Sequence, residues 1–167
     1  MVAVRAMLYA STFVGILFLY VPYEIAQADG GRVGLGMLHY SAFLLYVPGA
    51  VIAIWCVAGF IGYGHGTPAP FDPPRQLVAR GPYRWVRNPM YVGGFLFMLG
   101  QCVWFGSPRV AIYLIALCVA AELFVIFYEE PTLKRKFGGP YKHYLRNVPR
   151  WIPRPPRTPT ENIHDAL

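Results

Sequence analysis

The chain has 167 residues, which is the size of one domain. Hydrophobic residue types make up 56% of it and charged types only 14%, against about 45–50% and about 25% in soluble domains. This composition excludes intrinsic disorder, a collagen-like fibre and a disulfide scaffold as descriptions of the whole chain.

Long uncharged stretches indicate helices that cross a membrane. Charged residues are absent from 18 positions at 6–23, from 39 at 33–71 and from 21 at 88–108. A helix needs about 17–25 mostly apolar residues to cross the hydrocarbon layer. A removed signal peptide is disfavoured because only one basic residue precedes the first stretch and further apolar stretches follow. We therefore predict an all-α integral membrane protein with four transmembrane helices, at about 6–21, 37–61, 89–106 and 110–128.

The order of these stretches also predicts the domain organisation. Only Gly106, Ser107, Pro108 and Arg109 join the last two predicted helices, so these helices should form a tight antiparallel hairpin. Basic and aromatic residues alternate over 137–153, as expected of an interfacial C-terminal segment. We expect one membrane domain at 1–152, followed by a Pro-rich cytosolic tail at 153–167.

The distribution of basic residues predicts the orientation. Of the 15 lysines and arginines, 13 lie before the first predicted helix, in the 62–88 loop or after the fourth helix, and only Arg32 and Arg109 lie on the other side. Basic residues gather on the cytosolic side of membrane proteins, so both termini should be cytosolic. The chain is then a multi-pass protein of the cell membrane, or of the inner membrane in a bacterium. Nucleic-acid binding, the other explanation of a net charge of +7, would need a soluble basic face.

The first polar cluster opens the third predicted helix. Asn88 followed by Pro89 is typical of a helix start, because Asn is a favoured N-cap and Pro suits the first helical position. The N–H groups there suit an anion, and Arg87 could add a bidentate contact to it. Gly93 and Gly94 leave room for a flat ligand or a neighbouring helix. The same residues also fit a capped helix with an interfacial aromatic belt and a glycine packing face.

The second polar cluster is Glu129-Glu130, expected at the end of the fourth helix. Carboxylates at a helix C-terminus oppose the helix dipole, so they need a compensating partner. A bound cation is one candidate, and ion pairs with Arg84, Arg87 or the lysines near residue 134 are another. Glu122 lies seven residues before Glu129, on nearly the same predicted helix face, and is a candidate for a functional or pairing role.

A cationic helix start, two carboxylates and an aromatic basic segment thus meet at one predicted membrane face. A ligand with both a carboxylate and positive charges would match this arrangement, and S-adenosylmethionine is one such ligand. The sequence has no P-loop and no metal-ligand motif such as CxxC or HExxH, so no metal site is predicted.

Several motifs resemble one enzyme family. Arg-Asn-Pro-Met-Tyr-Val-Gly at 87–93 resembles that family's Arg-His-Pro-x-Tyr-x-Gly motif. The Glu pair, Phe137-Gly138 and the Val-Pro-Arg-Trp-Ile-Pro segment at 148–153 resemble its second half. The family comprises the isoprenylcysteine carboxyl methyltransferases and phospholipid methyltransferases of membranes, and the resemblance covers about 80–153. This chain has Asn88 where many members have His, and Asn cannot exchange a proton near pH 7.

The resemblance implies a site at the cytosolic boundary. It assigns S-adenosylmethionine binding to Arg87, Asn88, Pro89, Tyr91, Gly93, Glu129, Glu130, Tyr141 and Tyr144. It makes Glu129, Glu130 and Arg87 the candidate catalytic residues and Arg150 a candidate substrate contact.

The resemblance also implies the reaction. A methyl group would pass to a lipophilic acceptor, such as an isoprenylcysteine carboxylate, an aminophospholipid or a related small molecule. The expected partners are this acceptor and the lipid bilayer, with no nucleic acid and no obligate protein partner. The alternative is a small non-enzymatic membrane protein with four spans, such as a transporter or an assembly subunit.

Overall fold

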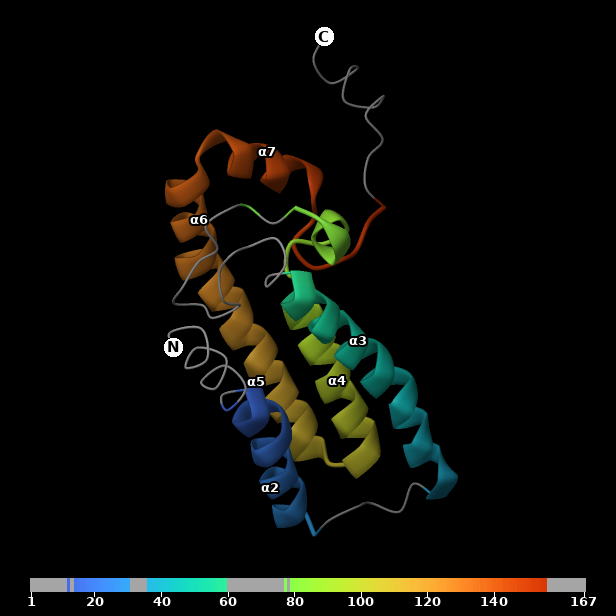
Figure 1. Cartoon of the computed structure of the whole chain (residues 1–167). Coiled ribbons are helices and arrows are strands. Elements are labelled where there is room, and N and C mark those ends of the chain that lie inside the picture. Colours follow the sequence, from blue (N-terminus) through green and yellow to red (C-terminus); the bar gives the residue numbers. More distant parts are fainter. Residues whose placement is uncertain (1–11, 13, 31–35, 60–76, 78, 156–167) are drawn as a thin grey trace.

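The computed structural model describes residues 12, 14–30, 36–59, 77 and 79–155, and all its regular elements within these ranges are helices (Figure 1). The predicted all-helical class is therefore confirmed. The start of the first predicted span and most of the Pro-rich tail lie outside the described residues.

The first described helix is longer toward its C-terminus than predicted. It consists of a π-helical turn, η1 (Ile16–Tyr20), and α2 (Val21–Ala28). The prediction of an end near residue 21 is wrong, because the exposed Glu24 is accommodated within the helix. The helix ends where the N–H of Asp29 bonds back to the carbonyls of Ile25 and Ala26, at 3.2 Å each.

The second and third predicted helices are found close to their predicted bounds. A 3-10 helix, η2 (Gly36–Ala42), leads into α3 (Phe43–Gly59), and α4 spans Pro89–Phe105. α3 and α4 lie side by side (Figure 1) and their backbones touch at two glycines. A Cβ placed on Gly93 would lie 2.9 Å from the carbonyl oxygen of Gly49, so only glycine permits this approach.

The predicted antiparallel hairpin between the last two apolar helices is confirmed. α4 ends at Gly106, which has a φ of 61°, and α5 (Pro108–Phe124) begins one residue after Ser107. The Ser107 hydroxyl caps α5 by accepting a hydrogen bond from the N–H of Val110 at 3.2 Å. A left-handed glycine followed by a serine cap reverses the chain in two residues.

The fourth predicted helix does not end at the carboxylate pair. A π-helical turn, η5 (Val125–Glu129), joins α5 to α6 (Glu130–Phe137), so one helix runs from Pro108 to Phe137. The prediction that the two carboxylates lie at a helix C-terminus, where they would oppose the helix dipole, is therefore wrong. Pro131 lacks an N–H and would crowd the preceding turn of an α-helix, and the wider π-turn directly before α6 accommodates it. α7 (Gly139–Asn147) then folds back across the end of the bundle (Figure 1).

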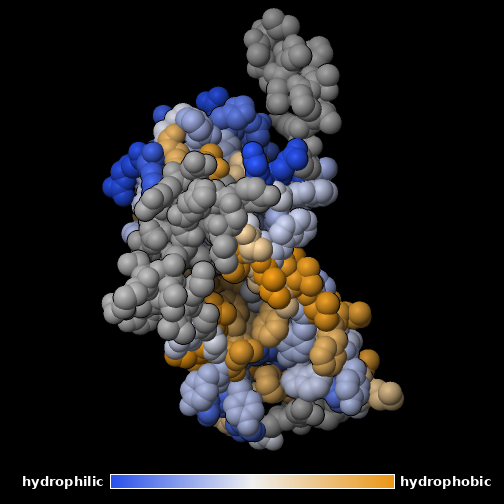
Figure 2. All heavy atoms as spheres, viewed as in Figure 1, coloured by the Kyte–Doolittle hydropathy of each residue, from blue (hydrophilic) through white to orange (hydrophobic). Residues whose placement is uncertain are grey.

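The apolar surface fits a membrane protein. The helices Gly36–Gly59 and Pro108–Phe137 are long and apolar enough to cross a bilayer, and Ile16–Ala28 and Pro89–Phe105 are shorter apolar helices. Large apolar side chains on α3 and α5 point outward, including Leu44, which is 77% exposed, and Ile112, which is 66% exposed. Figure 2 shows apolar residues over the middle of the molecule and hydrophilic residues over its α6–α7 end.

Candidate functional site

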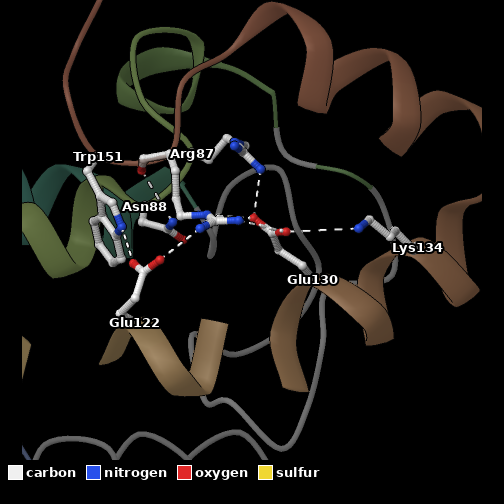
Figure 3. A network of polar contacts seen from close by, with 7 residues as sticks. Arg87, Asn88, Glu122, Glu130, Lys134 and Trp151 are labelled. Carbon is white, nitrogen blue, oxygen red and sulfur yellow. Dashed lines mark hydrogen bonds and ion pairs between the residues drawn. The ribbon is translucent and has the colours of Figure 1, made fainter. Parts of the chain in front are cut away.

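A cluster of two arginines and two glutamates lies at the α6–α7 end of the molecule (Figure 3). We call Arg87, Glu122, Glu130 and Arg150 the carboxylate–arginine cluster. Arg87 Nη1 donates to Glu130 Oε1 at 2.7 Å, and Arg150 Nε donates to the same oxygen at 2.9 Å. Arg150 Nη1 also donates to Glu122 Oε1 at 2.8 Å. Arg150 therefore links two carboxylates that belong to one long helix.

Glu130 is the most strongly compensated of these carboxylates. Its side chain is 10% exposed and lies within ion-pair distance of Arg87, Arg150 and, at 4.0 Å, Lys134. The predicted alternative of an ion pair with Arg87 or the nearby lysines is thus confirmed for Glu130. The hydrogen bond to Glu130 is the main cause that raises the pKa of Arg150 above its ordinary value.

The C-terminal segment is bound to the start of α4 by its backbone. The N–H of Arg87 donates to the Pro149 carbonyl at 2.8 Å, and Asn88 Nδ2 donates to the Arg150 carbonyl at 3.3 Å. Four residues after Arg150, the N–H of Arg154 donates to the Trp85 carbonyl at 3.0 Å. Residues distant in sequence thus close the site from one side.

Asn88 occupies the predicted N-cap position but does not act as a side-chain cap. It is 6% exposed, and its amide donates to the Arg150 carbonyl instead of accepting from the first turn of α4. The prediction of a capping side chain is therefore wrong, because the Asn88 amide is oriented toward a backbone carbonyl of the C-terminal segment. The N–H groups at this helix start are left without that acceptor.

Glu129 differs from its neighbour. Its side chain accepts a hydrogen bond from the Tyr91 hydroxyl at 3.3 Å, and among the described residues it forms no ion pair. The predicted alignment of Glu129 with Glu122 is wrong, since Arg150 joins Glu122 to Glu130. The π-turn before α6 shifts the helical register by about one residue, so Glu130 takes the face that Glu129 would have in an α-helix.

Two of the predicted tyrosines, Tyr141 and Tyr144, lie beside the carboxylate–arginine cluster rather than within it. Tyr141 and Tyr144 are buried in an apolar group with Leu133 and Val148. The Tyr144 hydroxyl donates to the Tyr83 carbonyl at 2.8 Å. Burial raises the pKa of Tyr141 to about 12 and also raises the pKa of Tyr144, so both stay neutral hydrogen-bonding groups.

Two other predicted site residues have packing contacts. Pro89 is buried at the start of α4, and Gly93 faces the α3 backbone at Gly49. Of the two alternatives for the glycines, a neighbouring helix accounts for Gly93. A cofactor contact at either residue stays a prediction.

Trp151 is a member of the site that the sequence did not single out. Its indole Nε1 donates to Glu122 Oε2, and its ring lies 6.1 Å from that of Tyr91 and 5.9 Å from that of Phe95. Its position directly after Arg150 in the motif was the available signal. The pairing role considered for Glu122 is confirmed by its contacts with Arg150 and Trp151.

The polar groups of this site can hold a ligand that carries both a negative and a positive charge. Arg87 Nε is buried and has no hydrogen-bond acceptor among the described residues, and the start of α4 lacks a side-chain cap. Both features suit a carboxylate. Glu129, which has no cation in the described structure, suits a positive group. The residues present therefore fit S-adenosylmethionine, which has a carboxylate, an ammonium and a sulfonium.

The fold and the site define an all-helical protein with apolar outer faces and a polar cluster at one end. The model of the phospholipid methyltransferase family matches residues 37–139, more than half of the chain, and the chain belongs to this family. The protein-S-isoprenylcysteine O-methyltransferase B of Arabidopsis thaliana is 36% identical over 81 residues, which are 47% of this chain and 40% of that relative. The match thus spans less than half of the relative's length. No solved structure matches the chain.

Proposed function

We propose that the protein is a membrane-embedded methyltransferase that moves a methyl group from S-adenosylmethionine to a lipophilic acceptor at the cytosolic interface. Membership of the phospholipid methyltransferase family and the name of the Arabidopsis relative support this class of reaction. The observation that carries the proposal is the half-buried Glu129 carboxylate, which accepts from Tyr91 and pairs with no cation among the described residues, next to an uncapped helix start. The non-enzymatic alternative gives no reason for this arrangement.

The proposed cofactor site divides the charges between two elements. Arg87 Nε and the first-turn N–H groups of α4 hold the cofactor's carboxylate, while Glu129 faces its cationic part. Tyr91 orients Glu129 through the 3.3 Å hydrogen bond, and Tyr141 and Tyr144 close the site from α7. S-adenosylmethionine, when bound, supplies the electrophilic methyl group.

Glu130 and Arg150 have a different proposed role. Both are engaged in the carboxylate–arginine cluster, so they position the site and do not need to touch the reacting atoms. Arg150 becomes a substrate contact only if an acceptor carboxylate displaces Glu122, the more exposed of its two partners at 36%.

The acceptor's chemistry decides whether a base is needed. Transfer to a carboxylate or a thiolate needs alignment and exclusion of water. Transfer to an amine also needs removal of a proton, and Glu129 is the candidate base because no cation in the described structure competes for it. Asn88 cannot serve, since its amide neither gives nor takes a proton near pH 7.

We also propose four spans with both termini in the cytosol. The hydrophilic α6–α7 end (Figure 2) holds most of the described basic residues, and Arg109 lies at the opposite end of α5. A reporter fused after Leu167 should be active only in the cytosol. Activity on the far side would overturn this orientation.

The decisive test is binding of S-adenosylhomocysteine to the purified protein by calorimetry. We expect the wild type to bind, and Glu129→Gln to lower the affinity by about tenfold or more, since a charge-assisted contact contributes about 1.5–3 kcal/mol. Glu24→Gln, an exposed change on α2, should leave binding unchanged. No binding by the folded wild type would overturn the proposal, and unchanged binding in folded Glu129→Gln would remove Glu129 from the site.

A further inference from the structure

An open cavity on the surface of the helix bundle lies far from the carboxylate–arginine cluster, toward the α4–α5 turn. It has a volume of about 730 Å³, within the usual range for small-molecule sites. Side chains of η1, α2, α3 and α4 line it, and most are aromatic or aliphatic. Its principal lining residues are Tyr23, Phe43, Tyr46, Phe97, Gln101 and Trp104.

Gln101 is the unusual residue in this wall. It is 4% exposed, and its Nε2 donates to the Phe18 carbonyl, which fixes the orientation of the amide. Its Oε1 is buried and has no donor among the described residues. Burying an unpaired amide oxygen costs about 1–3 kcal/mol, so a ligand that supplies a donor would recover stabilisation here.

Tyr46 provides a second polar group beside it. Its ring packs on Phe97, with centroids 4.8 Å apart, and its hydroxyl forms no hydrogen bond within the described part of the chain. Among the described residues, no Asp, Glu, Lys or Arg lines the cavity. The lining therefore suits an uncharged molecule that is mostly apolar.

The cavity is too far from the cluster to be part of the methyl-transfer site. Gln101 follows Asn88 by 13 residues along α4, and a rise of 1.5 Å per residue separates them by about 20 Å. A methyl donor held at the start of α4 cannot reach a group bound at Gln101.

We infer that this cavity binds an uncharged lipophilic alcohol or phenol, whose hydroxyl donates to Gln101 Oε1 and whose apolar body lies among the aromatic rings. The hydroxyl satisfies the unpaired amide oxygen, and the Tyr46 hydroxyl can donate to the oxygen of the same group. A saturated acyl chain would fill the space but leave Gln101 unpaired.

The test uses two probes that differ by one hydrogen-bond donor. Radiolabelled para-octylphenol is bound to the full chain in nanodiscs and displaced by unlabelled phenol or by its methyl ether, para-octylanisole. We expect saturable binding at one site, with the ether about tenfold weaker because it cannot donate. Equal potency of phenol and ether in the wild type would overturn the inference.

Variants then locate the site. Gln101→Leu should weaken the phenol about tenfold and abolish its advantage over the ether, without changing the affinity for S-adenosylhomocysteine. Ala50→Phe should block the cavity, whereas Ile112→Phe on the exposed face of α5 should not alter binding. Equal uptake by Ala50→Phe and wild type would mean that the probe only partitions into lipid. If Gln101→Leu does not fold, the comparison of phenol and ether binding to the wild type still tests the inference.

Discussion

The two ends of the helix bundle use charged residues in opposite ways. At the α6–α7 end, Arg87 and Glu130 are 15% and 10% exposed, and their partners come from segments far apart in sequence. At the α4–α5 turn, Arg109 pairs with Asp29 at 2.8 Å; the Arg109 side chain is 62% exposed, whereas that of Asp29 is 14% exposed and also accepts from Ser107. An exposed pair contributes at most about 1 kcal/mol, whereas a buried charge that loses its partner is strongly destabilising. The comparison teaches that the first end holds both the cation and the carboxylate away from water, whereas the second end leaves its cation in solvent.

The largest expected effect comes from breaking the carboxylate–arginine cluster. Arg150→Gln removes the cation that joins Glu122 to Glu130. We expect a loss of about 1.5–3 kcal/mol in the free energy of unfolding, because charge-assisted hydrogen bonds are lost while Glu130 keeps Arg87. Arg109→Gln, the matched change at the opposite end, should cost less, about 1 kcal/mol, because the cation is exposed and Asp29 keeps its hydrogen bond from Ser107. Unfolding by sodium dodecyl sulfate in mixed micelles measures both, and equal losses would contradict the comparison.

An intermediate effect is expected where α3 and α4 touch. In Gly93→Ala the new Cβ meets backbone atoms of α3, the nearest at 2.9 Å, and we expect a loss of about 1–3 kcal/mol. In Gly100→Ala, nearer the α4–α5 turn, the nearest atom belongs to the Tyr46 ring, at 3.0 Å. This ring borders the cavity and can move, so the loss should be smaller. Melting temperatures of the two variants provide the measurement, and a larger drop for Gly100→Ala would contradict this account.

The smallest expected losses of stability concern the residues at the starts of α4 and α5. Asn88→Ser keeps a good capping residue type but is too short to reach the Arg150 carbonyl, so it should lose about 0.5–1.5 kcal/mol, like Asn88→Ala. Ser107→Ala removes a true cap and should cost about 0.5–2 kcal/mol. Thermal melting compares all three. Wild-type stability in Asn88→Ser would mean that residue 88 caps α4 after all.

The sequence predicted the helices better than their ends. Proline at the start of α4 and the Gly-Ser-Pro turn before α5 are local signals, and both gave accurate bounds. Charges at Glu24 and Glu129-Glu130 suggested ends that the structure does not have. A helix continues through a charged residue when the backbone bonds remain available, and a π-turn lets the last helix continue past Pro131.

The candidate site was predicted as a set of residues but not as a set of contacts. The motifs brought Arg87, Asn88 and the two glutamates to one membrane face. They did not distinguish Glu130, which pairs with two arginines, from Glu129, which accepts from Tyr91 and forms no ion pair within the described residues. That distinction depends on a one-residue register shift within the helix, which composition and spacing do not encode.

The sequence by itself determined the helical class, the apolar helices, the hairpin and the resemblance to methyltransferases, because each rests on local patterns or short motifs. Only the tertiary structure decided which carboxylate is neutralised and where the Asn88 amide donates. It alone also assembled the cavity at Gln101. These features arise where the C-terminal segment meets the start of α4 and where three helices diverge, so they depend on contacts between residues up to 83 positions apart.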